Sequence, residues 1–390
     1  MKLKPSCLKG MENMYGIIKV EKYIDEKDNL SLEDTSGRVK IDKANSKINV
    51  NEFVSGIPIA LKGKLSDKGA FIVDDYLFYK PDCLTEQQNN DTPMEIETNS
   101  PNQNKNLILF ISNLRIGKPN ENKKEEGKLS SARTMLVDFI QNNNLNKKFS
   151  DISNRIKRVI FLGGSIYINE KIEELEKGSF IKAEEYKKEL NEIINNYTLL
   201  DKYLKLISSY INVDLINGIE GNDEVYFPQN KNSQLLFLEN MSNINAKTLN
   251  LVTNPYQFEI YSHKNKSKKS FLGTSGENIN CILQYTDIND PLVAMQKTIE
   301  WGHLAPLAPD TLRIYPYSQN DPLILNKIPD VYFISGKNNL NKKVIKYNNK
   351  DILLIEIPDF SNTCNGIIYN IDDDEINEIS FSQQQSFSKN

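Results

Sequence analysis

The sequence predicts a mixed fold in which a small all-β module precedes a larger α/β domain flanked by helices. Between Tyr15 and Lys80, short β-forming segments alternate with turn residues. Beyond residue 106, buried strand-like segments alternate with amphipathic helical ones, which is typical of α/β folds. The length of 390 residues also exceeds what one ordinary domain needs, so we expect two domains.

The amino-terminal module is expected at residues 13–82. Ser36-Gly37 and Asp67-Lys68-Gly69 are good turn sequences that separate its strands. The expected strands are residues 16–20, 38–41, 57–65 and 70–79. Several short strands so close together favour a small closed barrel of the OB type, although another small β module fits the pattern equally well.

Three segments have the composition of unpacked chain. Residues 83–106 are rich in Asn, Gln, Thr and Pro, so we expect a flexible linker. Residues 118–128, KPNENKKEEGK, are expected to form a surface excursion. Residues 371–390 are acidic and then rich in Ser and Gln, and this tail is expected to be disordered.

The α/β domain is expected at residues 107–370. Ser130 or Ser131 is the expected cap of its first helix, and Asp290-Pro291 opens a later helix that ends near Gly302. A long helix follows Ile181, and its apolar stripe is interpreted as core packing in preference to a partner-binding face. The expected buried strands are residues 107–112, 158–164, 331–335 and 352–357.

Composition limits the function. The chain has 48 Lys and Arg against 52 Asp and Glu, which argues against a protein whose main task is binding the phosphate backbone. Its four cysteines lie far apart and are interpreted as buried side chains in a reducing compartment. Only two histidines are present, which disfavours a histidine-rich metal centre. No apolar run has the length of a membrane span, so we expect a soluble nuclear or cytosolic protein.

Several long strings of the sequence occur in the same order in one known family. The amino-terminal strings are LSLEDTSGRVKI and VSGIPIALKGKLSDKGAFIVDDY. The later strings are LVTNPYQFEI (251–260), FLGTSGENI (271–279), HLAPLAPDTLRIYPY (303–317), DPLIL (321–325), DVYFISG (330–336) and IPDFS (357–361). Together they resemble the second, non-catalytic subunits of eukaryotic replicative DNA polymerases, and the amino-terminal strings resemble the OB domain of these subunits. The TNPY and FLGTSG strings look most like the polymerase delta subunit, while the small subunits of polymerases alpha and epsilon remain alternatives.

The resemblance implies an OB barrel beside a calcineurin-like phosphoesterase domain, a two-sheet sandwich flanked by helices. It also implies a non-catalytic scaffold in the nucleus, active in DNA replication and repair synthesis, with DNA contacted only indirectly. The implied partners are the cysteine-rich carboxy-terminal module of the polymerase delta catalytic subunit and a third subunit. No partner-binding residue is marked by a short motif.

Active phosphoesterases of this fold hold two metal ions with Asp, Asn and His side chains at strand ends. At the matching positions this chain has Asn113, Arg115, Gly164, Asp223, Ser275, Lys337 and Asn339. A guanidinium has no lone pair for a metal, and a lysine ammonium repels a cation. We therefore expect vestigial positions, no catalytic residue, no metal and no cofactor. Arg115 and Lys337 either pair with acids in the vacated cleft or are simply solvated.

Two rival functions are a metal-dependent nuclease with an unusual ligand set and a single-strand DNA binder. The basic run at residues 263–269 is expected to be a hairpin loop, either touching DNA or a solvated tip. The aromatic side chains of the last barrel strand alternate with Asp74 and Asp75, whose charges would repel phosphate. A role facing protein is therefore preferred for that strand.

Overall fold

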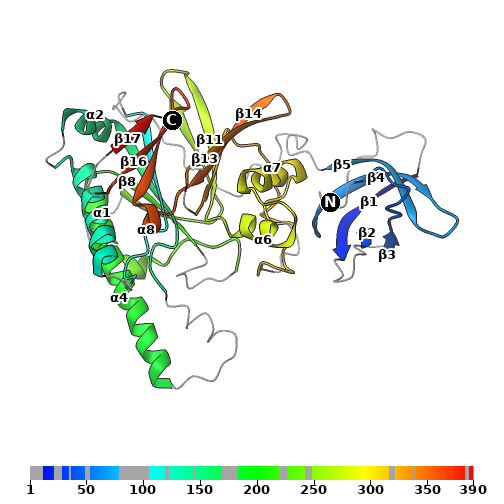
Figure 1. Ribbon diagram of the computed structural model, residues 1–390, viewed down its shortest axis with the longest axis horizontal. Coiled ribbons are helices and arrows are strands. Elements are labelled where there is room, and N and C mark those ends of the chain that lie inside the picture. Colours follow the sequence, from blue (N-terminus) through cyan, green and yellow to red (C-terminus); the bar gives the residue numbers. More distant parts are fainter. Residues whose placement is uncertain are drawn as a thin grey trace. The chain divides into compact units, whose positions relative to one another are not determined.

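The computed structural model describes most of the chain and divides it into two compact units (Figure 1). The first unit comprises Met1–Asp91 and Asn278–Ile328, and the second comprises Thr92–Glu277 and Pro329–Asn390. The described residues are 12–21, 29–34, 37–48, 53–78, 105–118, 123–143, 146–168, 183–218, 226–241, 248–315, 321–337, 339–382 and 386–389. Most of the expected linker, residues 83–104, lies outside them.

The first unit contains a five-stranded antiparallel sheet in the order β3-β2-β1-β4-β5. A bridge between Ile41 and Phe71 joins the end of β3 to β5, so the sheet curls toward closure as in an OB barrel. Its strands are β1 (Glu12–Glu21), β2 (Asn29–Asp34), β3 (Gly37–Lys40), β4 (Pro58–Leu65) and β5 (Phe71–Phe78). Strand β2 was not among the strands expected from the sequence.

Residues 278–328 group with the barrel, whereas the expected boundaries assigned them to the larger domain. This segment carries most of α6 (Glu277–Tyr285) and all of α7 (Pro291–Trp301). The Asp290 side chain caps α7, and Gly302 ends it with a φ of 68°, as predicted. Gly56 shows why the segment belongs to this unit, since a Cβ there would lie 1.7 Å from Pro306 O. Only glycine permits so close an approach of two backbones.

The second unit is a sandwich of two sheets. A seven-stranded sheet has the order β17-β16-β15-β6-β7-β8-β9, and a five-stranded sheet has the order β10-β11-β12-β14-β13. The strands of the first sheet are β6 (Leu107–Ser112), β7 (Ile156–Gly163), β8 (Asn212–Asn217), β9 (Leu249–Val252), β15 (Asn365–Asn370), β16 (Ile376–Ser380) and β17 (Ser386–Lys389). Those of the second are β10 (Tyr256–Ser262), β11 (Ser267–Thr274), β12 (Val331–Ser335), β13 (Asn341–Tyr347) and β14 (Lys350–Ile357).

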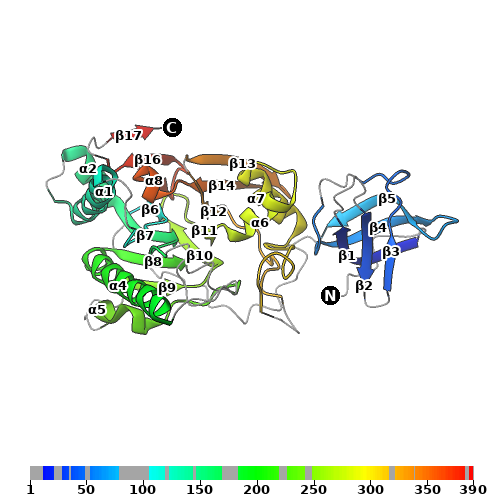
Figure 2. The same cartoon turned by 60° about the horizontal axis from the view of Figure 1, so that its bottom comes forward.

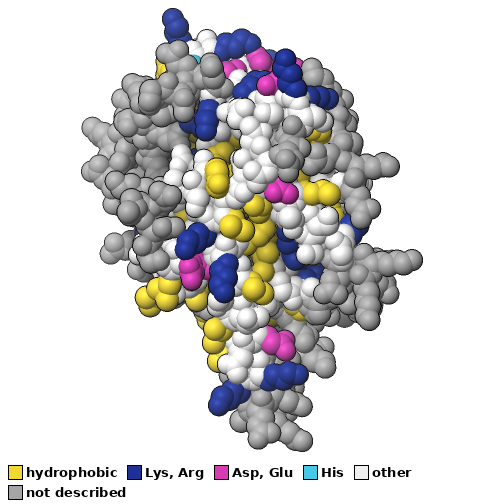
Figure 3. All heavy atoms as spheres, turned by 90° about the vertical axis from the view of Figure 1, so that its left-hand side faces the viewer, with side chains coloured by type: hydrophobic (Ala, Val, Ile, Leu, Met, Phe, Trp, Pro, Cys, Tyr) yellow, Lys and Arg dark blue, Asp and Glu magenta, His cyan; other side chains and the backbone are white. Residues whose placement is uncertain are grey.

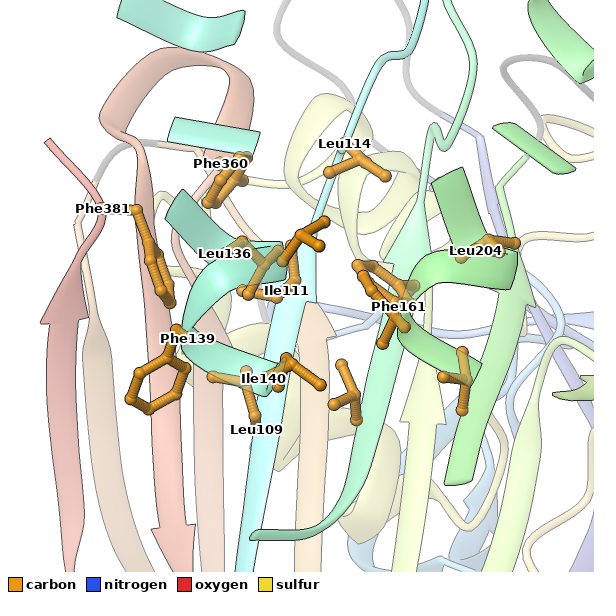
Figure 4. Close-up of a cluster of buried hydrophobic side chains, with 14 of the residues drawn as sticks. Leu109, Ile111, Leu114, Leu136, Phe139, Ile140, Phe161, Leu204, Phe360 and Phe381 are labelled. Carbon is orange, nitrogen blue, oxygen red and sulfur yellow. The ribbon is translucent and has the colours of Figure 1, made fainter. Parts of the chain in front are cut away.

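Helices cover the outer face of the seven-stranded sheet (Figures 1 and 2). They are α1 (Lys123–Gln141), α2 (Lys147–Arg155), α4 (Ala183–Ser208), the 3-10 turn η4 (Gln234–Phe237), α5 (Leu238–Met241) and α8 (Phe360–Thr363). Figure 4 shows Leu109 and Ile111 of β6 pointing toward Leu136 and Phe139 of α1. Ile108 and Phe110 belong to the other cluster, between the two sheets. Burial on both faces explains why the first five residues of β6 are all apolar. The predicted α/β sandwich flanked by helices is confirmed.

The prediction of a disordered tail from residue 371 is wrong. Strand β16 pairs antiparallel with β15, and Ile371, Ile376, Ile379 and Phe381 are buried. These four apolar side chains are spaced among the polar ones and supply the burial that orders the segment. The prediction of disorder considered the acidic composition of the segment and overlooked these apolar residues.

The acidic residues of this segment contact the basic run at residues 263–269. Residues 263–266 of that run form the β10–β11 turn, and residues 267–269 begin β11. Ser262 Oγ donates to Asp372 Oδ1 at 2.7 Å, and Lys264 pairs with Asp373. Lys269 and the Tyr369 hydroxyl both bond to Asp374. Lys264 and Lys269 are thus paired with acids of this segment, and Lys268 pairs with Glu259, which disfavours the DNA-contacting role for the basic loop.

Two helix predictions were partly wrong. Helix α1 begins at Lys123, so Ser130 and Ser131 lie inside it and part of the expected surface excursion is helical. The predicted core stripe of α4 holds for Tyr197, Leu200, Leu204 and Ile207, which are buried. It fails for Leu190 and Ile194, which are exposed. Among the helices that the structure describes, none has the length and apolar composition needed to cross a membrane.

Candidate functional site

The carboxyl ends of parallel strands from both sheets meet at one edge of the sandwich. Strands β6, β7 and β8 run parallel in one sheet, and β11, β12 and β14 run parallel in the other. Ligands in open α/β sheets bind outside the carboxyl ends of the strands, so this edge is the candidate site. We call it the strand-end cleft and define it by Asn113, Arg115, Gly163, Gly164, Ser275, Ser335 and Asp359.

Asn113 lies at the centre of the cleft and has both ends of its amide engaged. Its Oδ1 accepts from the backbone nitrogen of Gly164 at 2.9 Å. Its Nδ2 donates to Ser335 Oγ at 2.9 Å and to Asp359 Oδ2 at 3.2 Å. The backbone φ of 51° places Asn113 in the left-handed region, which Asn tolerates better than most residues. A side chain held in this way joins the two sheets instead of facing a ligand.

Arg115 supplies the cationic group of the cleft. Its Nε lies 4.0 Å from Asp359 Oδ2, with the two side chains 25% and 8% exposed. Of the two alternatives left open for Arg115, this contact favours pairing with an acid over simple solvation. Burial raises the pKa of the Asp359 carboxyl, although the hydrogen bond from Ser361 and the charge of Arg115 oppose that rise.

Gly163 leaves no room for a side chain at the end of β7. It has a φ of 79°, and a Cβ there would lie 2.4 Å from Asn113 Oδ1 and 3.1 Å from Ser335 Oγ. The adjoining Gly164 contributes its backbone nitrogen to Asn113. An aspartate at the end of this strand would need space that Asn113 and Ser335 fill.

Ser275 belongs to a buried polar chain beside the cleft. Its backbone nitrogen donates to Asn254 Oδ1 at 3.2 Å, and its hydroxyl bonds to Asn254 and Glu277. Asn254 Nδ2 also donates to Gln229 Oε1 at 2.8 Å. Gly276 brings this chain of hydrogen bonds close to the cleft, since a Cβ on Gly276 would lie 2.8 Å from Ser335 O. All of these hydrogen bonds are made between groups of the protein itself.

The remaining expected positions do not join these contacts. Lys337 and Asn339 are exposed, and Lys337 contributes only its backbone oxygen, which accepts from Asp359 N at 2.8 Å. Asp223, and Asn222 before it, lie outside the described residues.

The donor set of the cleft is unsuited to a pair of cations. An amide, a guanidinium, two hydroxyls and one carboxylate replace the several carboxylates and imidazoles that such sites use. In the parts of the chain that the structure describes, no three His, Cys, Asp or Glu side chains are grouped as metal ligands would be. The carboxylate that is present, Asp359, accepts from Asn113 and caps α8.

Ser335 and Asp359 were not predicted from the sequence as members of the cleft. Ser335 is the last residue of β12, and Asp359 follows β14. Functional side chains of such sheets gather at these strand ends, and this was a usable signal. The sequence analysis also did not predict a buried ion pair between the neighbouring strands β7 and β8. Arg158 Nη1 lies 2.5 Å from Asp214 Oδ2, and Asn250 Nδ2 donates to the other carboxylate oxygen at 2.8 Å. The sequence pattern of a buried strand does not indicate that two of its charged side chains will form a pair with each other or with a neighbouring strand.

Comparisons with known proteins agree with this architecture. The B-subunit family of DNA polymerases alpha and epsilon matches residues 108–341, and the DNA polymerase delta subunit OB-fold domain matches residues 1–76. The DNA polymerase delta small subunit of Oryza sativa subsp. japonica is 29% identical over 386 residues, covering 98% of this chain and 81% of its own.

Two further similarities extend to yeast and archaea. The DNA polymerase delta small subunit of Saccharomyces cerevisiae is 29% identical over 395 residues, covering 93% of this chain and 73% of its own. A solved archaeal phosphodiesterase structure covers 70% of this chain and 98% of its own, at 12% identity and a TM-score of 0.32.

Proposed function

The chain belongs to the B-subunit family of DNA polymerases alpha and epsilon, as a small accessory subunit of the delta type, and we propose that it is a scaffold for two other polymerase subunits. The first is the catalytic subunit, held through its cysteine-rich carboxy-terminal module. The second is a third, accessory subunit, which this chain bridges to the first. The proposed setting is DNA replication and repair synthesis in the nucleus.

The observation that carries this proposal is the state of the strand-end cleft. Every described polar side chain that defines it is bonded to another part of the protein, as shown for Asn113, Arg115, Ser275, Ser335 and Asp359. An enzyme needs groups that are left for the substrate. Here those groups stabilise the sandwich, which favours a protein whose function is binding.

The surface supports a binding role as well. Helix α4 contacts η4 and α5, and these three elements expose several apolar side chains (Figure 3). We define the α4 patch as Leu235 and Leu238, which lie beside α4 and are 77% and 62% exposed. Large apolar side chains exposed close together commonly mark a protein contact. We expect one of the two polymerase subunits to cover it.

Co-expression tests the proposal. The full chain is produced with the carboxy-terminal module of the delta catalytic subunit from the same organism, and the complex is followed by size-exclusion chromatography. We expect a complex that survives in moderate salt. A chain that elutes alone in the presence of that module contradicts the proposal.

A matched experiment addresses the nuclease alternative. The full chain is incubated with manganese and single-stranded DNA, and Asp223→Ala is the control variant. Manganese-dependent cleavage that this substitution abolishes would establish an enzyme and remove the basis of the scaffold proposal.

A further inference from the structure

Strand β13 forms an edge of the five-stranded sheet. It pairs antiparallel with β14 from Asn341 to Tyr347, and in the described part of the chain no other strand lies on its second side. Figures 1 and 2 show the β13–β14 hairpin at the margin of the sheet. Edge strands present a row of backbone donors and acceptors that an added strand can use.

The hairpin turn fixes which backbone groups of β13 face outward. Asn348 and Asn349 have φ values of 47° and 63°, which fits the two-residue turn that needs positive φ at both positions. In such a hairpin the flanking residues, here Tyr347 and Lys350, form a hydrogen-bonded pair, and pairs alternate from there. The backbone groups of Lys342, Val344 and Lys346 therefore point away from β14.

The same three residues share one face of the sheet, because side chains alternate along a strand. All three are exposed, and Val344 is 63% exposed. The neighbouring Ile345 points to the other face and is buried, which anchors the strand. An apolar side chain flanked by two cations thus lies beside the backbone groups that point away from β14.

We propose that the β13 edge binds an extended acidic segment of a partner protein as an added antiparallel strand. Carboxylates of that segment would lie opposite Lys342 and Lys346, and an apolar side chain opposite Val344. The strand NKKVIKY carries three lysines and no acid. Among the β14 residues opposite Lys342, Val344 and Lys346, only Asp351 is charged, so this edge keeps an excess of positive charge and its complement is acidic. Opposite charges directly across paired strands stabilise the pairing.

The charges of β13 also argue against two other binding partners for this edge, a second copy of the chain and a nucleic acid. A second copy paired antiparallel about Val344 would place Lys342 opposite Lys346 twice, and like charges directly opposite are destabilising. Nucleic acid would contact the lysines but would leave Val344 and the outward backbone row unused. The β13 edge and the polymerase role rest on different residues, so either proposal can fail without the other.

The test uses the full chain and a fluorescent, end-blocked peptide of about nine residues that alternates Glu with Val, a length typical of strands. We expect saturable binding that weakens about tenfold in Lys342→Glu/Lys346→Glu, since two cross-strand pairs are lost and two repulsions are created. A peptide of the same composition with all Glu before all Val is the control ligand and should bind much more weakly.

Proline provides the sharper variant. Val344→Pro removes an outward backbone donor but no bond to β14, so an edge strand should tolerate it. Val344→Ala removes the same apolar contact and keeps the donor. We expect Val344→Pro to weaken peptide binding several-fold more than Val344→Ala. Amide exchange at Lys342, Val344 and Lys346 should slow when the peptide binds.

Three results would overturn the proposal. One is no saturable binding, and another is equal loss in the two Val344 variants together with unchanged amide exchange. The third is a different occupant, either a single strand of thymine-only DNA that outcompetes the peptide or a dimer that Val344→Pro dissociates. If Val344→Pro fails to fold, the charge-reversed variant and the exchange measurement decide.

Discussion

Asn113 Nδ2 lies 3.2 Å from Asp359 Oδ2, and this contact joins the carboxyl ends of strands from opposite sheets of the sandwich. Asn113 follows β6 in the seven-stranded sheet, and Asp359 follows β14 in the five-stranded sheet. The place where the resemblance implies metal ions in active relatives is thus held together by an amide and a carboxylate of the protein itself.

The space at Gly163 yields the first prediction. We expect Gly163→Ala to lower the free energy of unfolding by about 1–3 kcal/mol, because a Cβ there meets Asn113 Oδ1 at 2.4 Å and the φ of 79° is strained. Chemical denaturation measures the change. Gly127→Ala in α1 is the control, with open space around the new Cβ and an expected gain of about 0.5–1 kcal/mol. Equal effects at the two glycines would contradict the steric account.

The raised pKa of Asp359 gives a pH prediction. The folded state retains the proton of this carboxyl to a higher pH than the unfolded chain, so its contribution to stability falls as the pH rises above about 4. Asp359→Asn should remove that part of the slope and leave stability at neutral pH little changed. Denaturation at several pH values from mildly acidic to neutral tests this, and an unaltered slope argues against it.

The buried ion pair predicts an asymmetric cost. Arg158→Met leaves Asp214 buried without its cation, which should lower the free energy of unfolding by about 3–5 kcal/mol. The double variant Arg158→Met/Asp214→Leu removes both charges and should recover a large part of that loss. Denaturation of both variants decides, and a double variant as unstable as the single one disagrees with this account.

The α4 patch predicts a separation of binding from stability. Leu235→Glu/Leu238→Glu should reduce co-purification with one polymerase subunit at least about tenfold, because charges replace apolar surface that a partner would bury. The melting temperature should stay nearly constant, since both side chains are exposed. Leu65→Glu, on an exposed leucine of the barrel unit, is the matched control and should leave that co-purification intact.

The sequence was sufficient to predict the elements whose signals are local. The cap and end of α7 at Asp290 and Gly302 follow directly from Asp-Pro and a terminal glycine. The buried strand β6 follows from an unbroken apolar run. The cleft position of Asn113 was also predictable, because it follows that strand directly.

Contacts between distant segments could not be predicted in the same way. The pairing of Lys264 with Asp373 joins residues 109 positions apart. Taken separately, the basic run predicts only a charged loop and the acidic run only a charged tail. The failed prediction for α4 has a similar cause. Helical spacing marks a stripe, but Leu190 and Ile194 are exposed because burial depends on what lies opposite.

The position of β15 beside β6 has a consequence for synthesis on the ribosome. Strand β6 is made early, yet its neighbour on one side, Asn365–Asn370, emerges some 250 residues later. Until then that edge of β6 has no partner strand within the sheet, and the nascent sandwich must be kept from pairing with other chains. A chain cut short before residue 365 would lack β15, β16 and β17, and β6 would then be an edge strand of the order β6-β7-β8-β9. The seven-stranded sheet can therefore be completed only after the ribosome has translated residues 365–370.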